Sequence, residues 1–173
     1  GDGKTAWNLG ESTRDGWVLD NGNLLLAMSK SANFPGGGVR EITRDGKVVF
    51  EYKGTQSEVN TVKALSGNRY LLGEAGSKPR LLEIDRDGKT VAEVPLQAQT
   101  KDHHLQTRMS RKLPNGNYLV PQLLDRVVRE YTAEGKIVWE VKTPSPMKIT
   151  KKQFLARQSF ACLQDAQIMQ AGP

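Results

Sequence analysis

Hydrophobic and polar positions alternate along most of this chain in short runs that turn residues separate. The clearest run is residues 113–120, Leu-Pro-Asn-Gly-Asn-Tyr-Leu-Val, and residues 127–141 follow with two more apolar segments around a Glu-Gly-Lys sequence. Asn-Gly and similar dipeptides supply the positive φ of a tight hairpin, and alternating or β-branched flanks are typical of strands. The pattern therefore predicts antiparallel strands joined by short turns.

This pattern recurs along the chain. Turns of the Asn-Gly-Asn or Ser-Gly-Asn type contain Gly22, Gly67 and Gly116, and turns of the Asp-Gly-Lys or Glu-Gly-Lys type contain Gly3, Gly46, Gly88 and Gly135. Successive glycines of one type are 42 to 49 residues apart, which is the spacing of a β-propeller blade with four antiparallel strands. A β-solenoid coil is usually shorter, and a β-sandwich would not predict repeated copies of one turn sequence.

We therefore expect an all-β fold, a β-propeller with blades at residues 14–54, 57–97 and 102–143. Residues 1–10 match the last strand of a blade, so an extra N-terminal strand is expected before the first complete blade. The predicted strands are residues 16–19, 23–29, 38–43, 47–52, 59–65, 69–74, 80–85, 90–94, 106–113, 118–122, 126–132 and 137–141. Residues 144–173 leave the pattern, and we expect there a short helix that covers a sheet edge, or a disordered tail.

Three blades and one strand do not close a ring, because a propeller needs about four blades or more. Open ends would expose strand edges, which readily pair with another chain. Two explanations follow. Either the chain is a fragment of a longer propeller, which the start in mid-blade favours, or two copies combine into a ring of about six blades.

An aromatic side chain recurs near the end of the last strand of a unit. It is Trp7, Phe50 or Trp139, and the second unit has no ring at the corresponding residues 92–94. We expect this ring to pack between neighbouring blades, because each blade needs a large apolar contact with the next.

Composition excludes several classes of protein. The net charge is +6 over 173 residues, but basic and acidic residues are interleaved and no basic stripe with aromatic residues appears, so nucleic-acid binding is not expected. Cys162 is the only cysteine, which rules out an internal disulfide and a cysteine-based metal motif. That usage fits a reducing compartment, or an exported bacterial protein without disulfides. No apolar run reaches the length of a membrane span, and no signal peptide is present in this chain.

Candidate chemistry gathers at one end of the predicted blades. In an antiparallel meander, the first strand begins where the second strand ends, so polar residues at these positions share one face. The densest segment is residues 102–108, Asp-His-His-Leu-Gln-Thr-Arg, where strand alternation would place His104, Gln106, Arg108 and Ser110 on one side. The face would also receive Arg14, Asp15, Lys30, Asn60, Lys78, Arg80 and Asp125. Our ligand-binding candidates are Glu58, Glu74, His103, His104, Gln106, Arg108 and Gln122, and His104 is the catalytic candidate.

A metal site is not expected. His103 and His104 would point in opposite directions on a strand, and no second histidine pair exists in the chain. Further ligands would have to come from carboxylates such as Asp102, Glu74 or Glu58. No local pattern of a serine or cysteine nucleophile is present.

The repeat resembles the PQQ-binding-like (quinoprotein-like) β-propeller repeat proteins of bacteria. The resemblance rests on residues 114–120 (Pro-Asn-Gly-Asn-Tyr-Leu-Val), 128–131 (Val-Arg-Glu-Tyr) and 135–139 (Gly-Lys-Ile-Val-Trp), and it covers about residues 1–143. The run from His104 to Lys112 is similar to a His-x-Gln-x-Arg segment in uncharacterised members of this family. Those members are expected to be exported. Those members often read Leu-Val-Pro-His where this chain has Gln122 after Pro121. The resemblance implies an incomplete, exported (periplasmic or extracellular) member.

The resemblance does not imply quinone chemistry. Quinoprotein dehydrogenases use eight blades, an Asp base, a calcium ion and often a vicinal disulfide, and none of these can be assigned here. We therefore expect no cofactor, neither PQQ nor calcium. Arylsulfotransferases share a similar repeat with a catalytic histidine, to which His104 corresponds only by location.

The sequence thus favours a non-catalytic binding or scaffold propeller. Its partner would be a small molecule, a glycan or a protein, and self-association could complete the propeller. The alternative is an enzyme of the transferase or lyase type, with His104 as base or nucleophile and Arg108 holding an anionic group. A scaffold without a ligand site is a third reading.

Overall fold

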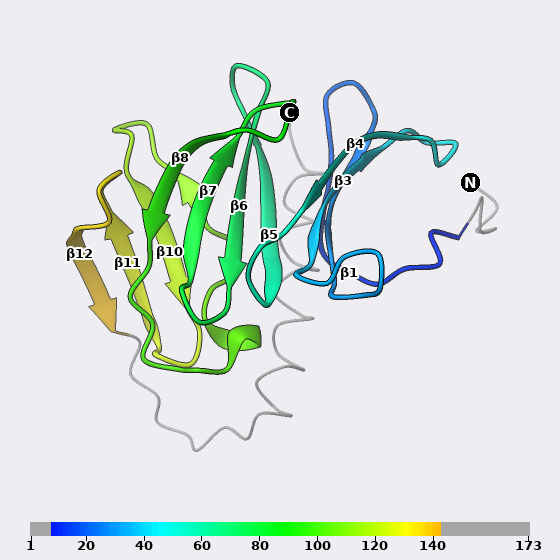
Figure 1. The fold of residues 1–173 in the computed structure, drawn as a ribbon. Coiled ribbons are helices and arrows are strands. Elements are labelled where there is room, and N and C mark those ends of the chain that lie inside the picture. Colours follow the sequence, from blue (N-terminus) through cyan, green and yellow to red (C-terminus); the bar gives the residue numbers. More distant parts are fainter. Residues whose placement is uncertain (1–7, 143–173) are drawn as a thin grey trace, which may run out of the picture. The chain divides into compact units, whose positions relative to one another are not determined.

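The computed structural model describes residues 8–142 of the chain, and within them the backbone forms three four-stranded antiparallel sheets (Figure 1). Sheet 1 contains β1 (Thr13–Val18), β2 (Leu24–Met28), β3 (Gly38–Ile42) and β4 (Val48–Lys53). Sheet 2 contains β5 (Glu58–Leu65), β6 (Arg69–Ala75), β7 (Arg80–Ile84) and β8 (Thr90–Pro95). Sheet 3 contains β9 (Arg111–Lys112), β10 (Tyr118–Gln122), β11 (Val127–Tyr131) and β12 (Ile137–Lys142). In each sheet the spatial order follows the sequence, as in a meander.

These sheets confirm the predicted all-β fold class and the repeated four-stranded unit. The strand predicted in residues 1–10 rests largely on residues outside the described range, and the predicted tail, residues 144–173, lies wholly outside it. Residues 8–142 contain no helix with the length and hydropathy that crossing a membrane would require.

The strand predicted at residues 106–113 is wrong for most of its length. A 3-10 helix, η1 (His103–Leu105), precedes it, and β9 covers only Arg111–Lys112. The carboxylate of Asp102 accepts a hydrogen bond from the backbone N–H of His104 and so caps this helix. Met109 then adopts a φ of 51°, which interrupts extended backbone. The alternation expected for His104, Gln106, Arg108 and Ser110 is therefore absent.

The Asn-Gly-Asn turns close as the sequence predicts. Gly116 has a φ of 87°, a conformation that glycine adopts without a steric penalty. The N–H of Leu113 donates to the carbonyl of Asn117 over 2.7 Å, and the Asn115 side chain accepts from the Asn117 N–H over 3.0 Å. The turn therefore fixes the register of β9 and β10.

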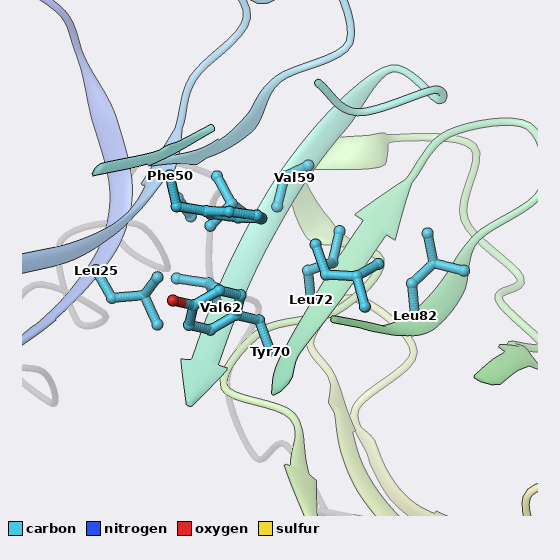
Figure 2. Close-up of a cluster of buried hydrophobic side chains, with 10 residues drawn as sticks. Leu25, Phe50, Val59, Val62, Tyr70, Leu72 and Leu82 are labelled. Atoms are coloured by element: carbon cyan, nitrogen blue, oxygen red, sulfur yellow. The ribbon is translucent and has the colours of Figure 1, made fainter. Parts of the chain in front are cut away.

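Apolar side chains fill the space between sheets 1 and 2 (Figure 2). Phe50 of β4 packs on Tyr70 of β6, with ring centroids 4.9 Å apart. Burying one such ring contributes about 1.5–3 kcal/mol. This contact agrees with the expected role of the recurring aromatic residue, whereas Trp139 of β12 is 49% exposed. A second cluster joins sheets 2 and 3 through Leu71, Leu81, Val94, Leu96, Tyr118, Val120 and Tyr131.

A buried glutamate also links each of the first two sheets to the next. The hydroxyl of Tyr70 in sheet 2 donates to Glu41 of β3, which Arg86 also contacts. The hydroxyl of Tyr118 in sheet 3 donates to Glu83 of β7 over 2.6 Å, and Lys112 pairs with that carboxylate. Neighbouring sheets are therefore joined by hydrogen bonds and ion pairs as well as by apolar packing.

Glycines allow sheets 1 and 2 to approach closely where β5 begins. The Gly54 N–H donates to the carbonyl of Gly37 over 2.9 Å. Gly37 has a φ of 69°, and a Cβ there would lie 2.5 Å from the backbone nitrogen of Val59. The backbone of Glu58 lies beside this close contact, since the same Cβ would be 3.2 Å from its carbonyl carbon.

Candidate functional site

Glu58, the first residue of β5, is the centre of a polar cluster that three elements build. The Nε of Arg14, from β1, donates to Oε1 of Glu58 over 2.6 Å. His104 Nδ1, from η1, lies 2.7 Å from Oε2 of the same carboxylate. His103 Nε2 lies 4.0 Å from that oxygen. We refer to Arg14, Glu58, His103 and His104 as the Glu58 cluster.

The carboxylate of the cluster is buried, whereas its arginine and histidine side chains are partly exposed. The side chain of Glu58 is 1% exposed, whereas that of Arg14 is 27% exposed and that of His104 is 39% exposed. A buried carboxylate is costly unless a partner compensates its charge, and the guanidinium of Arg14 does so. The acceptor oxygens therefore face inward, while the nitrogen-bearing side chains reach the surface.

His104 Nδ1 lies between two groups that make opposite demands on it. Nη2 of Arg14, which can only donate, is 3.0 Å away, and the carboxylate oxygen Oε2 of Glu58 is 2.7 Å away. A ring nitrogen donates or accepts according to its tautomer and does not do both. Nδ1 therefore forms a hydrogen bond with only one of the two groups, and Nη2 of Arg14 also pairs with Oε1 of Glu58.

Backbone contacts hold the turn that carries both histidines. The side chain of Asn60 donates to the carbonyl of His103 over 2.8 Å, and Arg108 Nη2 donates to the carbonyl of His104 over 3.3 Å. The imidazole rings lie with their centroids 4.1 Å apart and their planes at 45°. The expectation that these neighbouring side chains point in opposite directions is wrong, because they occupy a helical turn and not a strand.

The structure assigns the other three candidates to separate structural contacts. Glu74 binds the Thr55 side chain and backbone and the guanidinium of Arg80. Gln106 donates to the carbonyl of Gly76 over 2.9 Å and accepts from its N–H over 2.7 Å. Gln122 accepts from Arg129 and Tyr131. The cluster thus brings together Glu58, His103 and His104, adds Arg14, and has Arg108 behind it on the backbone.

Sequence reasoning placed Arg14 on the correct face but did not select it. The sequence carries no local signal for its role, since Arg14 and Glu58 are 44 residues apart. The repeat itself offered the available signal, because both residues lie where the first strand of a unit begins.

Comparison with known proteins decides the architecture. No protein-family model and no curated protein sequence matches the chain. Among solved structures, a protein of unknown function from Bacteroides caccae is 25% identical, with a TM-score of 0.67, over 81% of this chain and 50% of that one. The WD40 β-propeller domain of Doa1 is 18% identical, with a TM-score of 0.55, over 78% of this chain and 42% of that domain. The fold is that of a β-propeller.

A virginiamycin B lyase from Staphylococcus aureus is similar to the same extent. It is 18% identical, with a TM-score of 0.54, over 80% of this chain and 43% of the lyase. The chain thus spans half or less of each of these structures. At such identities the likeness concerns the fold, and each sheet described above is one propeller blade. The neighbours include an enzyme and a WD40 domain, so they favour no single activity.

Proposed function

We propose that this chain is a binding β-propeller whose ligand site is the Glu58 cluster. The observation that carries the proposal is the convergence of three blade segments on one buried carboxylate. A single blade needs no such cluster for its own hydrogen bonding, and loops at one end of a propeller are a common place for ligand contacts.

The distribution of donors indicates the kind of ligand. Arg14 uses its Nε and Nη2 groups in the contacts to Glu58 and His104, and Nη1 takes no part in them. The imidazoles of His103 and His104 add nitrogen atoms at the surface. A hydrogen bond from a guanidinium N–H to a carboxylate is charge-assisted and is roughly twice as strong as a neutral one. We therefore assign a carboxylate-bearing small molecule or an acidic sugar of a glycan as the ligand.

Thermal unfolding tests this assignment with galacturonate as the probe and neutral galactose as the matched control. Ligand at ten times its dissociation constant adds about 1.4 kcal/mol of stability, which raises the Tm by about 3–6 °C for a chain of this size. We expect this rise for the wild type and its loss in Arg14→Gln. PQQ and calcium are expected to leave the Tm unchanged. Equal effects of galacturonate and galactose, or an undiminished rise in Arg14→Gln, would refute the proposal.

A second candidate function is catalysis with His104 as general base. Glu58, which is buried and 2.7 Å from His104, has the geometry of a group that orients a catalytic base. One of the lyase neighbours is a catalytically inactive histidine-to-alanine variant with quinupristin, 16% identical to this chain. Here Arg14, and not Arg108, lies beside the imidazole. Chromatography of quinupristin after incubation tests this candidate: conversion that His104→Ala abolishes supports it, and no conversion by the wild type excludes this substrate.

The location follows from the family resemblance alone. We infer export to the periplasm or the cell exterior, as in the PQQ-binding-like repeat proteins that the chain resembles.

A further inference from the structure

The Glu58 cluster brings together one carboxylate and two imidazoles, which are side chains that bind divalent metal ions. Among the described residues, Glu58, His103 and His104 each offer one ligand atom, and these atoms all lie within 4.8 Å of one another. Two imidazoles and one carboxylate are a ligand set found in zinc sites that keep an open coordination position.

The distances are close to those of a tetrahedral site. Zinc bonds to histidine nitrogen and carboxylate oxygen are about 2.0–2.1 Å, so neighbouring ligand atoms lie roughly 3.3 Å apart. Here Oε2 of Glu58 is 2.7 Å from Nδ1 of His104 and 4.0 Å from Nε2 of His103. These two separations lie on either side of that value, and all three ligand atoms lie within 4.8 Å of one another.

The burial of Glu58 adds to this geometry. Its side chain is 1% exposed, whereas those of His103 and His104 are 34% and 39% exposed. A buried carboxylate needs a compensating positive charge. A metal ion held between the carboxylate and the two imidazoles would supply that charge and would stay accessible from the histidine side.

The surrounding contacts resemble the supporting shell of a metal site. Asn60 holds the His103 carbonyl and Asp102 holds the His104 N–H. Groups that fix the orientation of ligands contribute to metal affinity. This shell positions the histidine turn without using any of the three ligand atoms.

We propose that Glu58, His103 and His104 bind one divalent transition metal ion, with zinc as the best match, and that Arg14 competes for the same position. The site leaves at least one coordination position open, which a carboxylate ligand could occupy. The metal inference goes beyond the proposed binding function and does not require it, because the ion alone is the probe.

Titration with Co²⁺ and Zn²⁺ tests the site in the tag-free chain of 173 residues. Cys162→Ser is introduced in every protein so that its thiol contributes nothing. We expect visible absorption bands of four-coordinate cobalt, displaced by one equivalent of zinc. Glu58→Gln, His103→Ala and His104→Ala should each weaken zinc binding by at least about tenfold, the equivalent of about 1.4 kcal/mol.

Two further variants separate a metal site from a merely structural cluster. Arg14→Gln removes the competing cation and should tighten zinc binding several-fold, which a structural role would not predict. Glu74→Gln alters an equally buried carboxylate on the adjacent strand and should leave zinc affinity unchanged. Far-ultraviolet circular dichroism confirms that each variant is folded. Zinc binding that Glu58→Gln and the two histidine variants leave unchanged, or no binding by the wild type, would overturn the proposal.

Discussion

At the scale of single residues, glutamate recurs at the same position in the third strand of every sheet, as Glu41, Glu83 and Glu130. Burial raises the pKa of Glu41, but hydrogen bonds from Tyr70, Asn23 and Asn21 and the charge of Arg86 outweigh it, so the pKa lies below the ordinary 4.5. The pKa of Glu83 is lowered in the same way, with hydrogen bonds from Lys112 and Tyr118 outweighing burial. Glu130 binds only the amides of Asn115 and Asn117 in the contacts described.

Glu41→Gln should destabilise the fold, because Tyr70 and Arg86 lose a charged acceptor. The expected loss is about 1–3 kcal/mol near neutral pH, as for a hydrogen bond to a charged group. Because the folded-state pKa is lowered, the contribution of the carboxylate is fully present above pH 4.5 and disappears as the pH falls through that lower value. Urea unfolding of the wild type and the variant at a series of pH values measures the difference.

Glu130→Gln serves as the matched control, since it makes the same substitution at the corresponding position with no tyrosine hydroxyl among the described contacts. Its effect should be smaller than that of Glu41→Gln at pH values above 4.5, and the two effects should converge as the pH falls. Equal losses in the two variants near neutral pH, or a difference from the wild type that grows as the pH falls, would contradict this expectation.

The sequence predicted part of the candidate site and missed part for a physical reason. Glu58 and His104 lie where the first strand of a unit begins, so the repeat placed them on one face. Gln106, at the predicted start of a first strand, and Gln122, at the end of a second strand, were expected on the same face, but their amides bind backbone carbonyls of other loops. No pattern in a single sequence distinguishes an amide that binds a loop from one that faces a ligand.

At the scale of elements, the repeated turn sequences predicted most strands correctly. They did not predict the conformation of the segment that precedes β9. The strand predicted at residues 118–122 is β10 without change, because a hairpin turn and alternating burial agree there. The segment before β9 differs because the Asp102 cap forms one turn of helix before the chain extends. This local capping contact also places both histidines beside Glu58.

Gly37→Ala should disturb the contact between sheets 1 and 2. The new Cβ would meet the Val59 nitrogen at 2.5 Å and the Glu58 carbonyl carbon at 3.2 Å, at a residue with a φ of 69°. Backbone strain and overpacking together cost about 2–5 kcal/mol. Thermal and urea unfolding measure the loss, and we also expect weaker ligand binding because Glu58 must move.

Gly116→Ala provides the control for backbone strain alone. Gly116 has a φ of 87°, and a Cβ added there would have no neighbouring atom within 4 Å. Only the left-handed conformation is therefore penalised, by about 1–2 kcal/mol. If Gly37→Ala lowers the free energy of unfolding by no more than Gly116→Ala, the expected clash between sheets 1 and 2 at Gly37 does not occur.

At the scale of the whole molecule, sheet 3 presents the features that sheets 1 and 2 use to contact a following sheet. Trp139 corresponds to Phe50 and is 49% exposed, and Val138 and Val141 of the same strand are also exposed. Glu130 corresponds to Glu41. In sheet 1, Arg44 occupies the turn position that Arg86 occupies in sheet 2, and its Nε donates to the carbonyl of Gly22 over 2.8 Å.

We therefore expect self-association, with sheet 3 of one copy against sheet 1 of the other. Light scattering of the purified chain should give a dimer at micromolar concentration, and Trp139→Glu should shift it toward the monomer. Val91→Glu is the control, since Val91 of β8 is 50% exposed and lies outside sheet 3. A wild-type chain that is monomeric at every accessible concentration would contradict this expectation.

Nuclear magnetic resonance of the imidazoles tests most directly whether the Glu58 cluster binds the ligand. The chain contains only 2 histidines, so labelled imidazole nitrogens report on His103 and His104 alone. In metal-free protein, galacturonate should shift these signals saturably, galactose should not, and Arg14→Gln should abolish the shift. Imidazole signals that stay unchanged through the galacturonate titration of the wild type would contradict a ligand site at this cluster.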